Sequence, residues 1–320
     1  MTKARGHLIE EVTSTLEDAG FDLSSHCDVR PSCFDMVARK DDKLVLIKVL
    51  SNIDALTQDD AIALQLVAHF FDAIPLIVGR TTRRGSLDEG VVYKRYGVST
   101  ITPASLGAII AEQKMPREFI QRGGRFVAID GSRLQQVRLS MNMTKEELAS
   151  CVEVSARAIL AYEKDEMDVS TDVALQLEKV LETDLIIPID VLQNRPVTPP
   201  VQKNRVDPEL TEIHHRVNEF FERLGMHVLW SDRAPFHVAA KEKGRPIMSG
   251  VGSIKSWGLQ KRMEILKSVS EVTESDAVII VEEGRAEENI ADLPVIRQLE
   301  LDAIDKPREL KKIISERSGS

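Results

Sequence analysis

The sequence predicts a mixed fold in three parts, in which a central all-α domain lies between two similar α/β domains. Apolar residues recur at helical spacing through residues 131–163 with two short interruptions, a pattern typical of short helices joined by tight turns. Prolines recur at residues 196–208, which predicts a semi-rigid linker because proline cannot continue a helix. The order of predicted helices and strands before this central region is repeated after it.

These patterns place the domain boundaries. A chain of 320 residues has room for two or three domains of about 100 to 200 residues each. The first α/β domain is expected at residues 1–118, the helical domain at 119–193, the linker at 194–206 and the second α/β domain at 207–320.

The elements of the two α/β domains follow from helical periodicity and from short apolar runs. In the first domain we expect a helix at residues 7–19, strands at 33–39 and 43–50, a helix at 59–71 and a buried strand at 74–79. In the second we expect a helix at 210–224, strands at 236–241 and 246–251, a helix at 260–272 and a strand at 277–281.

The repeated order indicates that one α/β domain is a duplicate of the other. A gapless alignment of residues 33–51 with residues 235–253 supports this interpretation. It pairs identical residues at four positions, namely Phe34 with Phe236, Ala38 with Ala240, Val49 with Val251 and Ser51 with Ser253.

The central region begins with a connector at residues 115–124 and a short strand at 126–130. Thr144 precedes Glu147 by three residues, a spacing that predicts a capping box at a helix start. Ser155 is expected to cap the next helix. Only three or four residues separate the two helices, so they must pack closely.

This run resembles the helix-turn-helix of the Cro and phage-repressor (XRE) superfamily, which implies a five-helix Cro/repressor-like domain. Three positions depart from the family pattern, because Lys145 replaces a usual glutamine while Glu153 and Asp165 replace usual glycines. A left-handed non-glycine residue costs roughly 1 kcal/mol. The matching positions are Leu134, Val137, Arg138, Thr144, Glu146, Glu147, Leu148, Ala149, Val154, Ser155, Ile159, Tyr162 and Glu163.

The whole layout is similar to a family of archaeal HTH-type transcriptional regulators, in which the segment GGRFVAIDG leads into the motif. The resemblance implies sequence-specific binding of double-stranded DNA, with the helix that starts at Ser155 in the major groove. Arg157 is able to make a bidentate contact to guanine. The residues expected to contact DNA are Arg138, Thr144, Lys145, Ser155, Ala156, Arg157, Ala158, Ala161 and Lys164.

The charge of the chain limits this interpretation. The formal net charge is −9, whereas non-specific DNA affinity comes from cations that meet phosphates. Residues 133–164 are close to neutral, and Arg117, Arg122 and Arg125 add positive charge just before them. We therefore expect a homodimer, which would double a modest basic patch.

The α/β domains resemble the PD-(D/E)xK nuclease core, in which two carboxylates hold a metal ion and a lysine positions water. Asp35 and Lys48 occupy two of the required positions, but Leu46 stands where the second carboxylate belongs. Asp41 to Lys43 contains an acid-x-Lys string that falls at the expected hairpin tip. In the second domain the equivalent residues are His237, Met248 and Gly250. We therefore predict domains without catalytic residues, metal or cofactor.

Two alternatives remain open. One is a metal-dependent DNA nuclease that uses Asp35 and Lys48, and the other is a protein-interaction module whose helix-turn-helix binds a protein partner. No apolar run reaches the roughly 18 residues of a membrane span, and no signal peptide is apparent. Three cysteines without CxxC spacing fit a reducing compartment. A cytoplasmic protein is expected.

Overall fold

The computed structural model describes residues 3–193, 211–282 and 285–318. The linker expected at 194–206 lies outside the described residues. The chain forms two compact units, of which unit 1 comprises Met1–Glu11, Leu50–Ala55 and Ile77–Val191, and unit 2 comprises Val12–Val49, Leu56–Leu76 and Leu192–Ser320. Three elements contribute residues to both units: α1 (Lys3–Asp18), β3 (Lys43–Asn52) and β4 (Ile74–Thr82).

Unit 1 contains a sheet whose strands follow the order β7-β6-β8-β9. Strands β6 and β8 are parallel, and the other two pairs are antiparallel. Helix α3 (Pro103–Glu112) connects β7 to β8, and the Thr102 hydroxyl caps it by accepting a hydrogen bond from the Ser105 N–H at 3.0 Å. The strands are β5 (Gly85–Ser86), which pairs with β4, and β6 (Val91–Arg95), β7 (Val98–Ile101), β8 (Glu118–Gln121) and β9 (Gly124–Ile129).

Strand β9 joins this sheet to the helical region. It pairs with β8 on one edge, and it also pairs with β10 (Val169–Ser170) and β11 (Ile186–Ile187). The Asp130 N–H, which follows β9, donates to the Leu185 carbonyl at 2.9 Å. The boundary expected between residues 118 and 119 falls inside β8, so the expected connector at 115–124 is partly a strand.

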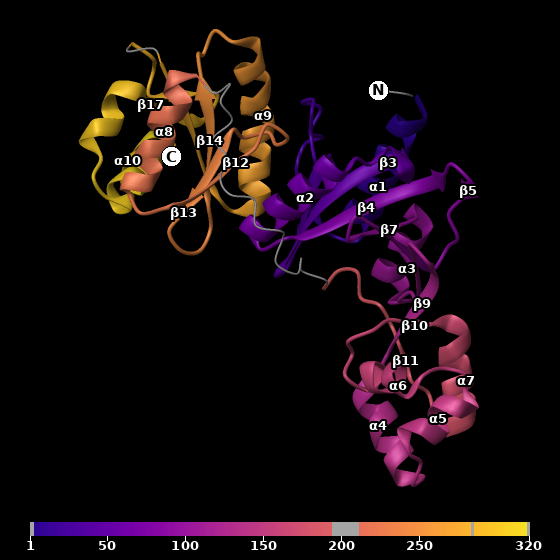
Figure 1. The fold of residues 1–320 in the computed structure, drawn as a ribbon. Coiled ribbons are helices and arrows are strands. Elements are labelled where there is room, and N and C mark those ends of the chain that lie inside the picture. The colour runs from indigo at the N-terminus through magenta and orange to yellow at the C-terminus, as the bar shows by residue number, and fades with distance from the viewer. Residues whose placement is uncertain (1–2, 194–210, 283–284, 319–320) are drawn as a thin grey trace. The chain divides into compact units, whose positions relative to one another are not determined.

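The helical region contains α4 (Gly131–Ser140), α5 (Lys145–Cys151), α6 (Ala156–Glu163) and α7 (Thr171–Leu181), which group next to β9, β10 and β11 (Figure 1). The expected five helices are therefore four between residues 119 and 193. After α7, the β-branched residues Ile186 and Ile187 pair with β9, and Pro188 then interrupts any helix. After α7 the chain therefore forms a short strand and no further helix up to residue 193.

Unit 2 contains two α/β modules. The N-terminal module consists of residues 12–49 and 56–76, and its strands β1 (Asp22–Leu23), β2 (Met36–Lys40) and β3 are antiparallel neighbours. Helix α2 (Gln58–Phe71) follows, capped by Thr57. The β2–β3 register pairs Lys40 with Lys43, so Asp41 and Asp42 form the hairpin tip, as predicted.

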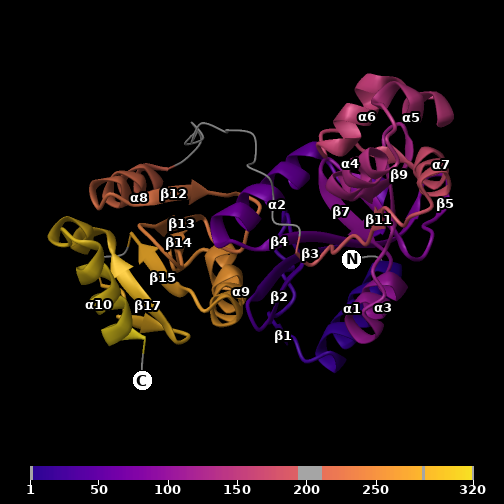
Figure 2. The ribbon, with the colours of Figure 1, turned by 90° about the horizontal axis from the view of Figure 1, so that it is seen from below.

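The C-terminal module comprises residues 211–282 and 285–318, and its six strands follow the order β12-β13-β14-β15-β17-β16. Helix α9 covers one face of this sheet, and α8 and α10 cover the other (Figure 2). Its helices are α8 (Glu212–Arg223), α9 (Trp257–Thr273), the 3-10 helix η2 (Gln298–Ala303) and α10 (Pro307–Arg317). Its strands are β12 (His227–Trp230), β13 (Val238–Lys241), β14 (Ile247–Gly252), β15 (Asp276–Val281), β16 (Asn289–Ile290) and β17 (Leu293–Arg297).

His237 forms a polar contact at the start of β13. Its Nδ1 accepts a hydrogen bond from the Val251 N–H at 2.9 Å. Burial of the ring, with a smaller effect from the positive charge of Arg262, lowers the pKa of His237 to about 3. The ring is therefore neutral at neutral pH, which suits its role as a hydrogen-bond acceptor.

We expect His237→Asn to weaken the loss of stability at acidic pH. Below an unfolded pKa of 6.5 the unfolded chain binds a proton that the folded ring binds only near pH 3, so acid favours unfolding in this window. Asparagine can accept the same hydrogen bond without titrating. Urea unfolding from pH 7 to 5 should show a difference in slope of up to about 1.4 kcal/mol per pH unit.

The wild-type protein, unfolded in the same buffers, provides the reference slope. Equal slopes for His237→Asn and the wild-type protein would show that this ring does not cause acid destabilisation.

Candidate nucleic-acid interface

The helix-turn-helix is held together by a small apolar core. Leu134 of α4, Leu148 and Ala149 of α5, and Ile159 and Tyr162 of α6 are all buried, and they belong to one cluster. The small side chain of Ala149 permits close approach of the two helices, as expected. This packing leaves the opposite side of α6 exposed.

Both helix starts are capped as predicted. The Thr144 hydroxyl accepts from the Glu147 N–H at 3.1 Å, and the Glu147 carboxylate accepts from the Thr144 N–H at 2.7 Å. Hydrogen bonds from Thr144 lower the pKa of Glu147. The Ser155 hydroxyl accepts from the Ala158 N–H at 3.1 Å and fixes the start of α6.

The two glycine replacements lie where the backbone is left-handed. Glu153 has φ of 54° in the turn between α5 and α6, and Asp165 has φ of 56° after α6. The Val154 N–H closes the first turn by donating to the Ala149 carbonyl at 3.0 Å. The protein therefore keeps the turn geometry at a cost of roughly 1 kcal/mol for each residue.

Eight of the nine predicted DNA-contact residues lie at least partly on the surface. Thr144, Ser155, Arg157 and Lys164 are exposed, whereas Lys145, Ala156, Ala158 and Ala161 are half-buried. The Arg157 side chain has no ion-pair partner within 4 Å among the described residues. It is therefore available for a contact outside the chain.

Arg138 is the exception, and its predicted phosphate contact is not supported by its placement. Its side chain is 4% exposed, and its Nε lies 2.6 Å from the Glu163 carboxylate. Its Nη1 also donates to the Met143 carbonyl at 2.8 Å. This buried pair joins α4 to α6, so Arg138 acts inside the domain rather than on DNA.

The basic approach before the motif is also smaller than predicted. Arg125 binds Glu118 at 2.8 Å and also binds Asp88, while Arg117 donates to the Ile186 carbonyl at 3.1 Å. Arg122 is exposed in the turn between β8 and β9. Most of this positive charge is therefore used within unit 1.

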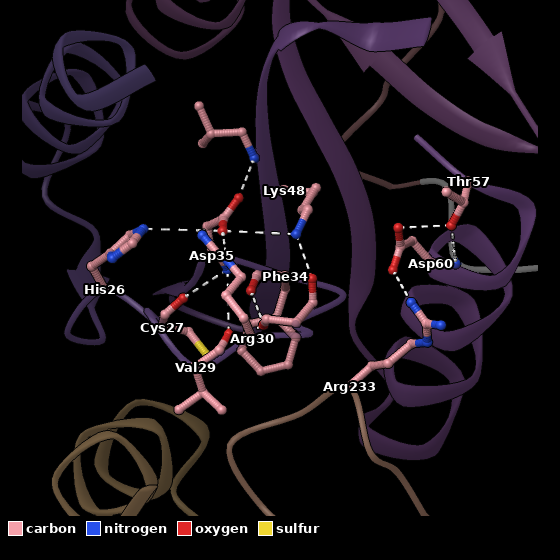
Figure 3. A network of polar contacts seen from close by, with 12 residues as sticks. His26, Cys27, Val29, Arg30, Phe34, Asp35, Lys48, Thr57, Asp60 and Arg233 are labelled. Carbon is pink, nitrogen blue, oxygen red and sulfur yellow. Dashed lines mark hydrogen bonds and ion pairs between the residues drawn. The ribbon is translucent and has the colours of Figure 1, made fainter. Parts of the chain in front are cut away.

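The residues of the possible nuclease centre meet in the N-terminal module, as Figure 3 shows. Asp35 is fully buried, and one of its carboxylate oxygens accepts from the Val49 N–H at 2.8 Å. The other oxygen lies 3.6 Å from Arg30, 3.8 Å from Lys48 and 4.0 Å from His26. The carboxylate therefore faces cationic and ionisable groups.

The second carboxylate that nuclease chemistry needs is replaced at its expected position. The position expected to supply it is Leu46, which is buried on β3. Across residues 3–193, 211–282 and 285–318, no group of three or more His, Cys, Asp or Glu residues could hold a metal ion. Within the same ranges no helix has the length and apolar character needed to cross a membrane.

Residues 5–116 match a PD-(D/E)XK superfamily domain, and residues 134–186 match a helix-turn-helix family. Archaeal proteins that are provisionally named HTH-type transcriptional regulatory proteins match nearly the whole chain. The chain belongs to this archaeal family. The Methanosarcina acetivorans protein is 33% identical over 98% of this chain and 97% of its own, the Thermococcus kodakarensis protein 34% over 97% and 95%, and the Pyrococcus furiosus protein 33% over 97% and 97%. No solved structure matches the chain.

One structural residue of this family member escaped prediction. Gly131 begins α4, and a Cβ added there would lie 2.3 Å from the Tyr162 carbonyl oxygen. Its N–H donates to the Asp165 carboxylate at 3.2 Å. Only glycine allows the start of α4 to approach the end of α6 this closely. A glycine at the first helical position was the available signal.

We expect Arg138→Met to destabilise the helical region by about 3 to 5 kcal/mol, because it leaves the Glu163 carboxylate buried without its ion-pair partner. Chemical denaturation followed by circular dichroism would measure the loss. Lys179→Met, at an exposed position of α7, is the matched control and should change stability by less than about 0.5 kcal/mol. A loss below about 1 kcal/mol for Arg138→Met would contradict a structural role for the pair.

Proposed function

We propose that this protein is a sequence-specific DNA-binding transcriptional regulator that reads the major groove with α6. The observation that carries the proposal is the exposed Arg157 in the first turn of α6, the capped second helix of a Cro/C1-type motif. The names of its relatives as transcriptional regulators support the same function. Ser155, Ala156, Arg157, Ala158 and Ala161 are proposed to face the bases.

Direct base readout depends mainly on Arg157. Its guanidinium is exposed, and a bidentate contact to guanine O6 and N7 discriminates by about 1 to 3 kcal/mol. The neighbouring alanines offer apolar contact to thymine methyl groups. Thr144, Lys145 and Lys164 are proposed to bind phosphates, which fix the register of the motif without reading sequence.

A homodimer is part of this proposal. Among the nine predicted contact residues, only Lys145, Arg157 and Lys164 remain as cations outside the core, and Glu146 and Glu153 are exposed nearby. One motif therefore neutralises few phosphates, and two copies on adjacent half-sites would double this number.

We further propose that the α/β modules are non-catalytic and that Asp35 is structural. Its hydrogen bond to the Val49 N–H and its cationic neighbours account for its burial without a metal ion. The nuclease alternative rests on the closeness of Asp35 and Lys48 and on the PD-(D/E)XK match. It needs a second carboxylate, and Leu46 cannot supply one. The three domain boundaries and the cytoplasmic location stay predictions.

The regulator function is tested by selecting genomic fragments with the purified protein and then measuring the affinity of variants for a selected site. We expect Arg157→Lys to lower the affinity about 5- to 150-fold while keeping most of the salt dependence, because lysine keeps the charge but loses the bidentate geometry. Arg157→Ala should also lower the salt slope. Lys179→Ala on α7 is the control and should bind as the wild-type protein does.

Two results would contradict this proposal. If the selection enriched no fragments, the proposed sequence-specific binding would be contradicted. If Arg157→Lys left the site preference unchanged, the assignment of Arg157 as the base-reading residue would be contradicted. Enrichment of a protein partner by the same surface, with no affinity for DNA, would favour the protein-interaction alternative.

The nuclease alternative has its own test. We expect no cleavage of supercoiled plasmid or branched DNA by the wild-type protein in the presence of Mg²⁺ or Mn²⁺, since Leu46 stands where the second of the two metal-binding carboxylates belongs. Gel electrophoresis over several hours would detect nicking. Metal-dependent cleavage that Lys48→Met abolishes would overturn the non-catalytic proposal, whereas equal cleavage by both proteins would indicate a contaminant.

A further inference from the structure

The two modules of unit 2 repeat each other in individual hydrogen bonds. In the N-terminal module the Asp35 carboxylate accepts from the Val49 N–H at 2.8 Å, and in the C-terminal module His237 Nδ1 accepts from the Val251 N–H at 2.9 Å. The same gapless alignment that pairs Phe34 with Phe236 pairs these donors and acceptors. Unlike side chains thus make the same contact at equivalent places.

The backbone hydrogen bonds of Asp35 and His237 also correspond between the two modules. The Asp35 N–H donates to the Ile47 carbonyl at 2.7 Å, and the His237 N–H donates to the Ser249 carbonyl at 2.9 Å. Helix α2 ends at a left-handed Asp72, and α9 ends at a left-handed Glu274. Asp72 and Glu274 are separated by the same number of residues as Asp35 and His237.

The contacts between the modules are reciprocal. Arg39 of β2 donates to the Val272 carbonyl at 2.6 Å, near the end of α9. Lys241 of β13 donates to the Phe70 carbonyl at 2.5 Å, near the end of α2. Arg39 aligns with Lys241, and Phe70 keeps the same spacing to Val272. Each module therefore inserts an equivalent cation into the equivalent helix end of the other.

This arrangement has a clear physical basis. The last carbonyl groups of a helix lack partners within the helix and carry partial negative charge, so a cation stabilises them. Arg39 also lies 3.3 Å from the Glu274 carboxylate. Burial lowers the pKa of Lys241, and the negative charge of Asp72 opposes this change.

The segments before the first hairpin strand of each module extend the symmetry. In the C-terminal module, Arg233 binds Asp60 of α2 at 2.5 Å, the contact drawn in Figure 3. In the N-terminal module, the Ser25 N–H donates to Ser268 of α9 at 2.7 Å. Asp28 also binds Lys261 of α9 at 2.8 Å. Each module thus contacts the helix of the other with the same region of its fold.

We propose that the two α/β modules form an isologous pair within one chain, with Arg39 and Lys241 as its reciprocal contacts. The partner that fits the surface of α2 and β2 is thus a second copy of the same fold, supplied by the C-terminal module. In an isologous interface the same patch serves both partners, which matches these contacts. The surface is satisfied in cis, so any dimer formed for DNA binding uses other surfaces. This inference uses no residue of the helix-turn-helix and is independent of the proposed function.

Disulfide trapping in the full-length chain tests the pairing. Ser25→Cys with Ser268→Cys, in a Cys151→Ser background, places one thiol at the position of the Ser268 hydroxyl and the other on the residue whose backbone N–H donates to that hydroxyl. Mild oxidation at low micromolar concentration should give a disulfide within one chain, identified by peptide mapping. Ser14→Cys with Ser268→Cys is the control, because Ser14 is exposed on α1 and its hydroxyl bonds Asp18 of the same helix.

The two possible contrary results are distinct. Cross-linking no faster than in the control would overturn the interface itself. A product of twice the chain mass would overturn its formation within one chain. DNA affinity, measured separately, would remain unchanged in either case and so would not confuse this test with that of the proposed function.

The reciprocal cations have a second test. In the Cys151→Ser background, reaction of the thiol introduced by Ser268→Cys with a labelling reagent reports opening of the interface. Arg39→Met and Lys241→Met should each accelerate labelling about 2- to 30-fold, as expected for the loss of a partly buried cation at a helix end. The exposed Lys243 provides the control variant Lys243→Met. Acceleration by only one of the two variants would contradict the reciprocity.

Discussion

The pairing of β9 with strands on both sides is the constraint on which unit 1 depends. The strand bonds β8 in the sheet and also β10 and β11, which border α7. The Gln121 side chain adds a hydrogen bond to Asp168 at 2.9 Å, and the Pro116 carbonyl accepts from the Ile189 N–H at 2.7 Å. The helix-turn-helix is therefore attached to the sheet of unit 1 at several places rather than by one connecting segment. Its helices are anchored in the ladder that also carries β6 and β8.

Within the helix-turn-helix, α6 is held by tertiary interactions that oppose the local backbone preferences of the residues at its two ends. Two non-glycine residues, Glu153 and Asp165, adopt left-handed backbone at either end of α6. The buried pair of Arg138 and Glu163 compensates by joining α6 to α4, although burial of two charges gives little net stability. The pair fixes α6 against α4, because the Arg138 guanidinium bonds both the Glu163 carboxylate and the Met143 carbonyl. Asp165 contributes a second tie through the Gly131 N–H.

The sequence predicted the elements whose periodicity is strong, and it missed those whose existence depends on distant partners. Thr144 and Ser155 each accept a hydrogen bond from an N–H three residues later, so both caps were predictable from the local sequence. The resemblance implied five helices, whereas residues 186 and 187 after α7 pair with β9, a distant strand that the resemblance did not identify as a partner. Arg138 was assigned to DNA by resemblance to the family motif, and its ion pair with Glu163, which lies far along the chain, could not be seen from helical periodicity. The two-residue strands β1 and β16 are too short to give any period.

The hydrogen bonds of Asp35 in the N-terminal module and of His237 in the C-terminal module indicate which feature the two α/β modules share. Asp35 and His237 differ in charge, in shape and in acid–base chemistry, yet both accept the N–H of an equivalent strand residue. The equivalent of Lys48 is Gly250, so the ion pair of the first module has no counterpart in the second. A hydrogen bond that supports the first hairpin is thus common to both, whereas the groups that nuclease chemistry needs are incomplete in one and missing in the other. The shared feature is one that stabilises the fold, and it lies directly beside the surfaces through which the modules contact each other.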